Sequence, residues 1–124
     1  MYNEFESWLD DALNAELPED VAAFNFNLYE DDDGLWSMEL IGASWFDAES
    51  PDWAEDEVFT NREDPLCWRA EADWEDVLET MIVYIERYLC DGRYADVLKS
   101  SEAVGVGFVD GDITIVCVGD EFAA

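Results

Sequence analysis

The spacing of the apolar residues changes from one segment of this chain to the next. In residues 74–89 apolar side chains recur every three to four positions, which indicates a long amphipathic helix. A shorter stripe with the same spacing covers 5–13, between Asn3 as the expected N-cap and Pro18 beyond the end. A further short helical piece is expected at 94–99. These segments predict the helical part of the fold.

Other segments alternate apolar and polar residues, which is the pattern of half-buried strands. The alternation occurs in 22–29 and 36–40, and the Asp-Asp-Asp-Gly sequence between them favours a turn. It recurs in 104–108 and 113–117 around Asp110-Gly111, a dipeptide typical of two-residue hairpin loops. The chain is therefore expected to contain two β-hairpins.

One region has no sustained period. Residues 46–65 hold two prolines and many acids, so we expect a long surface loop with a helical turn near 53–57. The alternation at 66–70 then predicts a short third strand. The element order is α-β-β-β-α-β-β, with helices and hairpins segregated along the chain. This order predicts one α+β domain over residues 1–124, an antiparallel sheet of about five strands with two main helices packed on one face.

The chain carries an extreme negative charge. It has 33 Asp and Glu against five Lys and Arg, with no His, and a formal net charge of -28. Its apolar fraction of 50% is far above that of a disordered acidic tail, so the acids belong to a folded domain. A net charge of magnitude about 2 to 8 already keeps a small domain in solution, and a larger one destabilises the fold by self-repulsion. The excess of acids therefore calls for a functional explanation.

The charge and the absence of certain segments exclude several functions. Direct binding to nucleic acid or to anionic membranes is not expected, because both need a basic patch and the chain has hardly a cation from which to build one. No run of residues approaches the eighteen or so apolar residues of a membrane-spanning helix. The first residues also lack the basic and apolar regions of a signal peptide. We therefore expect a cytoplasmic protein.

No pattern of residues predicts catalysis or a cofactor. The absence of His removes the Ser-His and Cys-His pairs of nucleophilic catalysis and most zinc sites. Cys67, Cys90 and Cys117 are widely spaced, so we interpret them as reduced thiols in or near the core. The run of acids before Gly34 lacks the alternating ligands of a calcium-binding loop. We expect neither an enzyme nor a metal or cofactor site.

Acids combined with large aromatic residues on segments outside the core are the remaining signal. Trp8, Trp36, Trp68 and Trp74 fall at inward positions of the predicted elements and are expected to be structural. Trp45 follows the outward register of its strand, and Trp53 either anchors a partner or turns back onto the core. A field of carboxylates around such an aromatic residue suits a basic protein partner. The candidate partner-binding residues are Asp31, Asp32, Asp33, Trp45, Asp47, Glu49, Asp52, Trp53, Glu55, Asp56 and Glu57.

In its size, acidity, abundance of Trp and element order, the whole chain resembles the small immunity proteins that bacteria encode beside polymorphic or contact-dependent toxins. The resemblance concerns the class of protein and rests on no diagnostic motif. It implies inhibition by tight binding over a toxin, often a basic nuclease, with carboxylates where phosphates would lie.

Three alternatives stay open. The first is a DNA mimic that blocks a DNA-binding protein, which needs carboxylates spaced like phosphates over a long face. The second is a domain adapted to molar salt, which the scarcity of Lys favours. The third is an enzyme that uses carboxylates with Mg²⁺. Stability measured against KCl would identify the second, and sensitivity of the activity to chelation the third.

Overall fold

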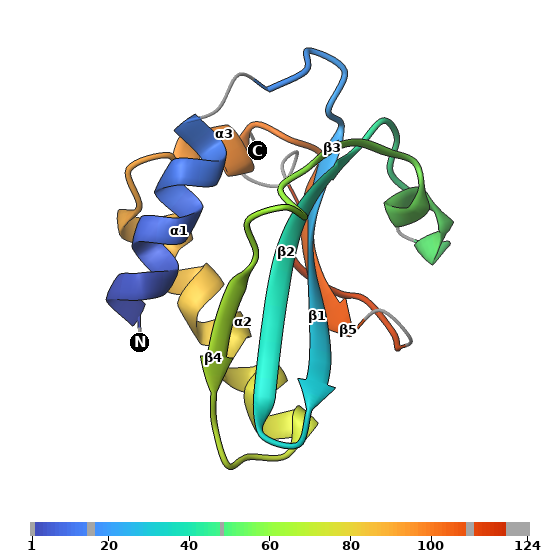
Figure 1. The fold of residues 1–124 in the computed structure, drawn as a ribbon. Helices are drawn as coiled ribbons and strands as arrows, with labels where there is room; N and C mark the ends of the chain where they lie inside the picture. Colours follow the sequence, from blue (N-terminus) through green and yellow to red (C-terminus); the bar gives the residue numbers. More distant parts are fainter. Residues whose placement is uncertain (1, 15–16, 48, 109–110, 119–124) are drawn as a thin grey trace.

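The computed structural model describes residues 2–14, 17–47, 49–108 and 111–118. Within them the chain forms a mostly antiparallel sheet with helices on one side, as expected of an α+β domain (Figure 1). The elements are α1 (Tyr2–Asn14), β1 (Ala23–Asp32), β2 (Leu35–Ala43), the 3-10 helix η1 (Pro51–Glu55), β3 (Glu57–Thr60), β4 (Leu66–Arg69), α2 (Trp74–Asp91), α3 (Ala95–Lys99), β5 (Ala103–Phe108) and β6 (Thr114–Val118).

The sheet has six strands among the described residues, in the order β3-β2-β1-β5-β6, with β4 also paired to β2. The long strand β2 bonds β4 along its first half and β3 along its second half. The expected hairpins β1–β2 and β5–β6 are both present. The second has no two-residue loop at Asp110-Gly111, because β5 ends at Phe108 and β6 begins only at Thr114; Asp110 itself lies outside the described residues. The sheet departs from the predicted antiparallel form at one pairing: β1 and β5 run parallel, with Phe24 opposite Val104.

The main core lies between the sheet and the helices, which cover one face as predicted. Strand alternation directs Phe24, Phe26 and Leu28 of β1 toward this core. Phe5 of α1 and Tyr88 of α2 meet there, each at 0% exposure, with their ring centres 6.3 Å apart. Burying one such side chain contributes about 1.5–3 kcal/mol, so α1 and α2 are held mainly by this shared apolar face.

A second, smaller core lies on the opposite face under η1. Trp53 is 1% exposed and packs with Ile41 and Ala103, and Phe46 joins it at 5.1 Å between ring centres. Ser50 is the N-cap of η1, and its hydroxyl accepts a hydrogen bond from the Asp52 backbone N–H at 3.4 Å. The helical turn expected near 53–57 is therefore present, slightly earlier in the chain. The expected long loop also contains β3. This strand was not predicted, because it has only four residues.

Several single residues differ from expectation. Trp74 was predicted in the core but is 55% exposed, because it is the first residue of α2 and its indole lies against Phe108 instead of under the helix. Cys67 and Cys90 are exposed, on an edge strand and on the outer side of α2, whereas Cys117 is buried as expected. Asn3 lies inside α1 and is not its N-cap.

Candidate functional site

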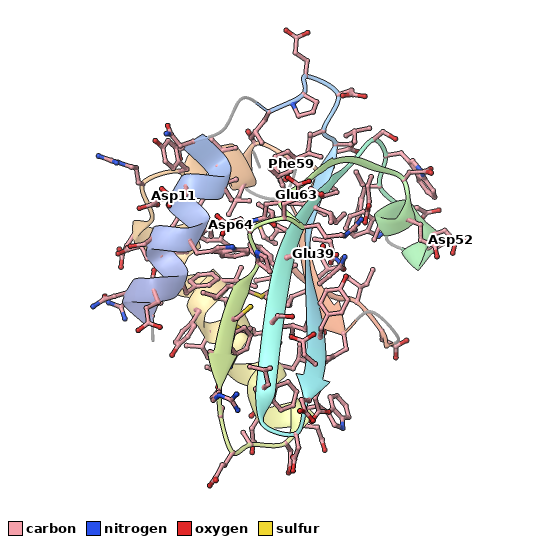
Figure 2. All side chains as sticks on the ribbon, viewed as in Figure 1. Asp11, Glu39, Asp52, Phe59, Glu63 and Asp64 are labelled. Atoms are coloured by element: carbon pink, nitrogen blue, oxygen red, sulfur yellow. The ribbon has the colours of Figure 1, made fainter. Side chains whose placement is uncertain are left out.

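The face of the sheet away from α1 and α2 is only partly covered by η1. Four polar side chains of β1 and β2 extend over the same face, because their neighbours along each strand point into the main core. They are Asn25, Asn27, Tyr29 and Glu39, and they line a cleft of about 460 Å³. We call it the polar cleft; its wall also includes Asp52, Ala54, Glu55, Glu57, Arg62, Phe108, Gly111 and Ile113. Figure 2 shows Asp52 on η1 and Asp11 on α1 at opposite sides of the sheet.

Glu39 is the centre of this face. It is 1% exposed, and Arg62 bonds both of its carboxylate oxygens, from Nε at 2.8 Å and from a terminal nitrogen at 3.2 Å. The Tyr29 hydroxyl and the Asn27 amide also donate to Glu39 Oε1, at 2.5 Å and 3.1 Å. Burial raises the pKa of the Glu39 carboxyl, but these donors outweigh it, so the pKa lies below its ordinary value. Glu39 is therefore a buried, ionised acceptor.

Arg62 reaches this position because of the residue before it. The Asn61 side chain accepts from the Leu40 backbone N–H at 2.7 Å, and the Asn61 backbone donates to the Leu40 carbonyl at 3.1 Å. These bonds fix the chain beside β2, so the next side chain extends over Glu39. Arg62 also bonds Glu57 at 2.8 Å, and hydrogen bonds to both carboxylates raise the pKa of its guanidinium. Among the described residues, every ion pair uses Arg62.

A chain of hydrogen bonds leads from Glu39 to a buried oxygen. Because Glu39 only accepts, Asn27 must present its NH₂ group to it and its carbonyl to Asn25. The Asn25 amide donates to that carbonyl at 2.6 Å, which leaves Asn25 Oδ1 buried with no donor in the described part of the molecule. A Cβ on Gly105 would lie 2.8 Å from this oxygen and 2.7 Å from Ile113 Cγ2, so a larger residue there would displace these side chains. The direction of the whole network thus follows from one carboxylate.

Two further hollows adjoin the polar cleft. One of them lies at the end of the sheet where α2 begins, because Trp74 of α2 and the core-facing Leu28 line it. A groove of about 550 Å³ shares Tyr29, Phe108 and Gly111 with it, and its other lining residues are Leu28, Glu30, Asp31 and Trp74. We call it the aromatic groove. A smaller hollow of about 220 Å³ shares Ile113 with the polar cleft, and its other lining residues are Asp47, Glu49, Ser50, Trp53, Asp112 and Ile115. The hairpin tip and the acidic loop, which lie far apart in the sequence, therefore border hollows that share lining residues.

The sequence-predicted residues fall into three groups. Those that line a hollow are Asp31, Asp47, Glu49, Asp52, Trp53, Glu55 and Glu57. Asp32 and Asp33 are exposed at the hairpin tip, where the Asp32 carboxylate accepts the Asp33 N–H. Trp45 is 37% exposed, and its indole N–H donates to the Asp56 carboxylate. Of the two interpretations of Trp53, the structure shows the buried one, so its indole offers almost no surface to a partner.

Sequence reasoning missed the residues that organise the cleft. Glu39 and Arg62 carry no motif and lie far apart in the sequence. A signal was nonetheless present, because Asn25, Asn27 and Tyr29 share the outward register of their strand and Arg62 is the first cation in the chain. An outward-facing row of polar residues on one strand, in a chain whose first cation is Arg62, is a pattern that could have identified this face.

Two exposed carboxylates of the polar cleft are available to bind positive charge. They are Asp52 and Glu55, whereas Glu39 and Glu57 already bond Arg62, which is the one cation among the described lining residues. Compared with family models, characterised proteins and solved structures, the chain gives no match. The described residues include no cluster of three or more Cys, Asp or Glu that could hold a metal ion. None of the described helices has both the length and the apolar character needed to cross a bilayer.

Proposed function

We propose that this protein binds a basic partner protein through the surface formed by the three adjoining hollows, and acts as an inhibitor of the immunity type. The observation that carries the proposal is the position of the two acidic segments. Asp31 of the hairpin tip and Asp52 of the acidic loop border adjoining hollows that share Tyr29, Phe108 and Gly111. Neither carboxylate has an ion-pair partner among the described residues, so both remain to bind a basic protein at this recessed surface.

The charge of this surface also has a kinetic consequence. A field of one sign raises the rate of association with an oppositely charged partner by a factor of about 10–10³ and lowers it again as salt is added. At physiological ionic strength the field extends about 8 Å, so only carboxylates near the contact contribute fully. Association should therefore depend on which acids are removed, not only on how many.

A basic nuclease toxin is the partner that we propose. Its active site and substrate channel must attract phosphates, so the same cations would bind carboxylates held at the surface of this protein. Asp52 and Glu55 are the acids best placed to test the idea, because both are exposed and line the polar cleft without a side-chain bond among the described residues.

The test is capture of basic proteins from lysate of the source organism on three immobilised forms of the protein. One form is the parent. The second carries Asp52→Asn and Glu55→Gln, which remove two charges from the polar cleft. The third carries Asp11→Asn and Glu79→Gln, which remove the same two charges from exposed positions of α1 and α2. The captured partner is then purified, and its association rate with each form is measured against salt concentration.

We expect one stoichiometric basic protein on the parent and on the helix variant. The cleft variant should bind it several-fold more slowly and with a weaker salt dependence. If the two variants bind equally, the binding face is not the one proposed. If only a salt-labile mixture is captured on every form, the protein has no specific basic partner. An enzymatic assay of the captured protein, with and without its binder, then decides whether binding inhibits a nuclease.

A further inference from the structure

The aromatic groove contains the most exposed tryptophan that the structure describes. The Trp74 side chain is 55% exposed, whereas Trp36 and Trp53 are each 1% exposed. Large exposed aromatic residues are uncommon on a monomer surface and are enriched where proteins bind one another. The exposure of Trp74 therefore needs an explanation other than its position at the start of α2.

A row of aromatic rings holds Trp74 in place. Its ring centre lies 6.1 Å from that of Phe108, at an interplanar angle of 88°. Phe108 in turn lies 5.9 Å from Trp36, which is buried in the main core. The indole thus rests on a packed support while more than half of it stays exposed. A side chain ordered in this way loses little conformational freedom when a ligand binds to it.

Carboxylates share the groove with this indole. Glu30 and Asp31 belong to the last residues of β1, and both line the groove with Trp74. Among the described residues, neither carboxylate has an ion-pair partner, since each ion pair there uses Arg62. An aromatic face and free carboxylates in one groove are the two groups that recognise an organic cation.

We propose that the aromatic groove receives an arginine side chain of the basic partner, with the guanidinium on the Trp74 indole and hydrogen-bonded to Glu30 or Asp31. This inference rests on the proposed function and names the part of the partner that enters this groove. Arginine fits better than lysine, because its planar guanidinium stacks on an aromatic ring while its five N–H groups remain free to bond carboxylates. A lysine ammonium is a point charge that cannot satisfy both groups in this way.

The probe for this site is the blocked peptide acetyl-Gly-Arg-Gly-amide, titrated into the isotope-labelled protein and followed by NMR. Its control is the same peptide with citrulline, which has the shape of arginine without the charge. We expect the arginine peptide to shift the Trp74 indole N–H and the amides of Glu30 and Asp31, and the citrulline peptide to shift them far less. A lysine peptide should bind more weakly than the arginine peptide.

Two variants of exposed apolar side chains separate the groove from the rest of the surface. Trp74→Leu removes the aromatic ring and keeps an apolar side chain, and should weaken binding of the arginine peptide by about two- to fivefold. Val83→Ala is the control on the same helix, because Val83 is 58% exposed and lies outside the lining of the groove. It should leave the affinity unchanged. Glu30→Gln with Asp31→Asn should weaken binding while the indole remains in place.

The inference is overturned if the citrulline peptide shifts the same signals equally, or if Trp74→Leu binds as well as the parent. It is also overturned if the arginine peptide shifts mainly residues around Asp52 and Glu55, a result that would leave the proposed function intact. Failure of the proposed function is seen separately, as equal capture of the partner by the polar cleft and helix variants.

Discussion

Replacement of Arg62 by methionine tests whether the Glu39 network organises the sheet face. Arg62→Met keeps most of the apolar stem and removes the guanidinium that bonds Glu39 and Glu57. Glu39, whose side chain is 2% exposed in the parent, then keeps only the donors of Tyr29 and Asn27. A buried carboxylate that loses its cation is destabilising, because its charge is no longer compensated.

The expected loss can be bounded from the geometry. Removing one partner of a fully buried ion pair costs about 3–5 kcal/mol. The Arg62 side chain is 55% exposed, so water from the cleft replaces part of what the guanidinium supplied. The contact with the more exposed Glu57 adds at most about 1 kcal/mol. We therefore expect Arg62→Met to lower the free energy of unfolding by about 2–3 kcal/mol at pH 7, measured by urea unfolding.

The difference in stability between the parent and Arg62→Met should depend on pH. In the parent the pKa of Glu39 is lowered on folding, so its contribution to stability is present above the unfolded pKa of about 4.3 and is lost as pH falls through the folded pKa. Arg62→Met removes one of the donors that lower the pKa of Glu39, so burial raises this pKa relative to the parent. The variant therefore loses less stability than the parent as the pH falls. The difference between the two proteins should therefore shrink from pH 7 to about pH 3.

A second substitution shows whether the loss of stability comes from the uncompensated charge or from poorer packing. Adding Glu39→Gln to Arg62→Met removes the uncompensated charge, and should recover at least about 1 kcal/mol of the free energy lost by Arg62→Met alone. The reasoning is refuted if the single variant loses less than about 1 kcal/mol, if its loss is the same at both pH values, or if the double variant is less stable than the single one.

Three further outcomes follow from the structure. Gly92→Ala should lower the free energy of unfolding by about 1–3 kcal/mol in a urea titration, because its Cβ would lie 2.5 Å from the ring of Tyr88, which is 0% exposed. Cys67 and Cys90 should react with a thiol reagent in the native protein and Cys117 only after unfolding, which a spectrophotometric titration counts. The thermal midpoint should rise as KCl is added and level off below about 1 M, since screening of self-repulsion is then complete; a rise that continues through molar KCl would instead indicate salt adaptation.

The elements with a sustained apolar period could be predicted from the sequence. The stripe at 74–89 became α2, and the alternation around the Asp-Asp-Asp-Gly turn became the hairpin of β1 and β2. Both patterns are local, because the residues that define them lie within one element or one turn. The presence of helices on one face followed from the same periods, since each element has a single apolar side to bury.

Pairings between distant segments could not be predicted in this way. β3 has four residues and no alternation, and it is a strand only because β2 extends past β4 and offers it an edge. The parallel pairing of β1 with β5 depends on how the intervening helices return the chain to the sheet. The exposure of Trp74 likewise depends on Phe108, which lies far from it in the sequence.

The candidate site could likewise be predicted only in its local features. The sequence located its acidic loops, because a run of carboxylates without cations is visible in any window. It did not reveal that these loops border adjoining hollows, nor that Glu39 connects Arg62 to Asn25 through the Asn27 side chain. Such a network is a property of strand register, since a shift of one residue would turn Glu39 into the main core.

The parallel pairing of β1 with β5 also sets the order in which this chain can fold. Ala23 is opposite Ala103, so β1 cannot pair with β5 until about eighty further residues have been synthesised. Until then β1 has β2 on one side and an open, apolar edge on the other, which is the form of a strand most prone to pairing with another chain. Contacts of such long range slow folding. The high negative charge keeps incomplete chains apart by mutual repulsion during this interval.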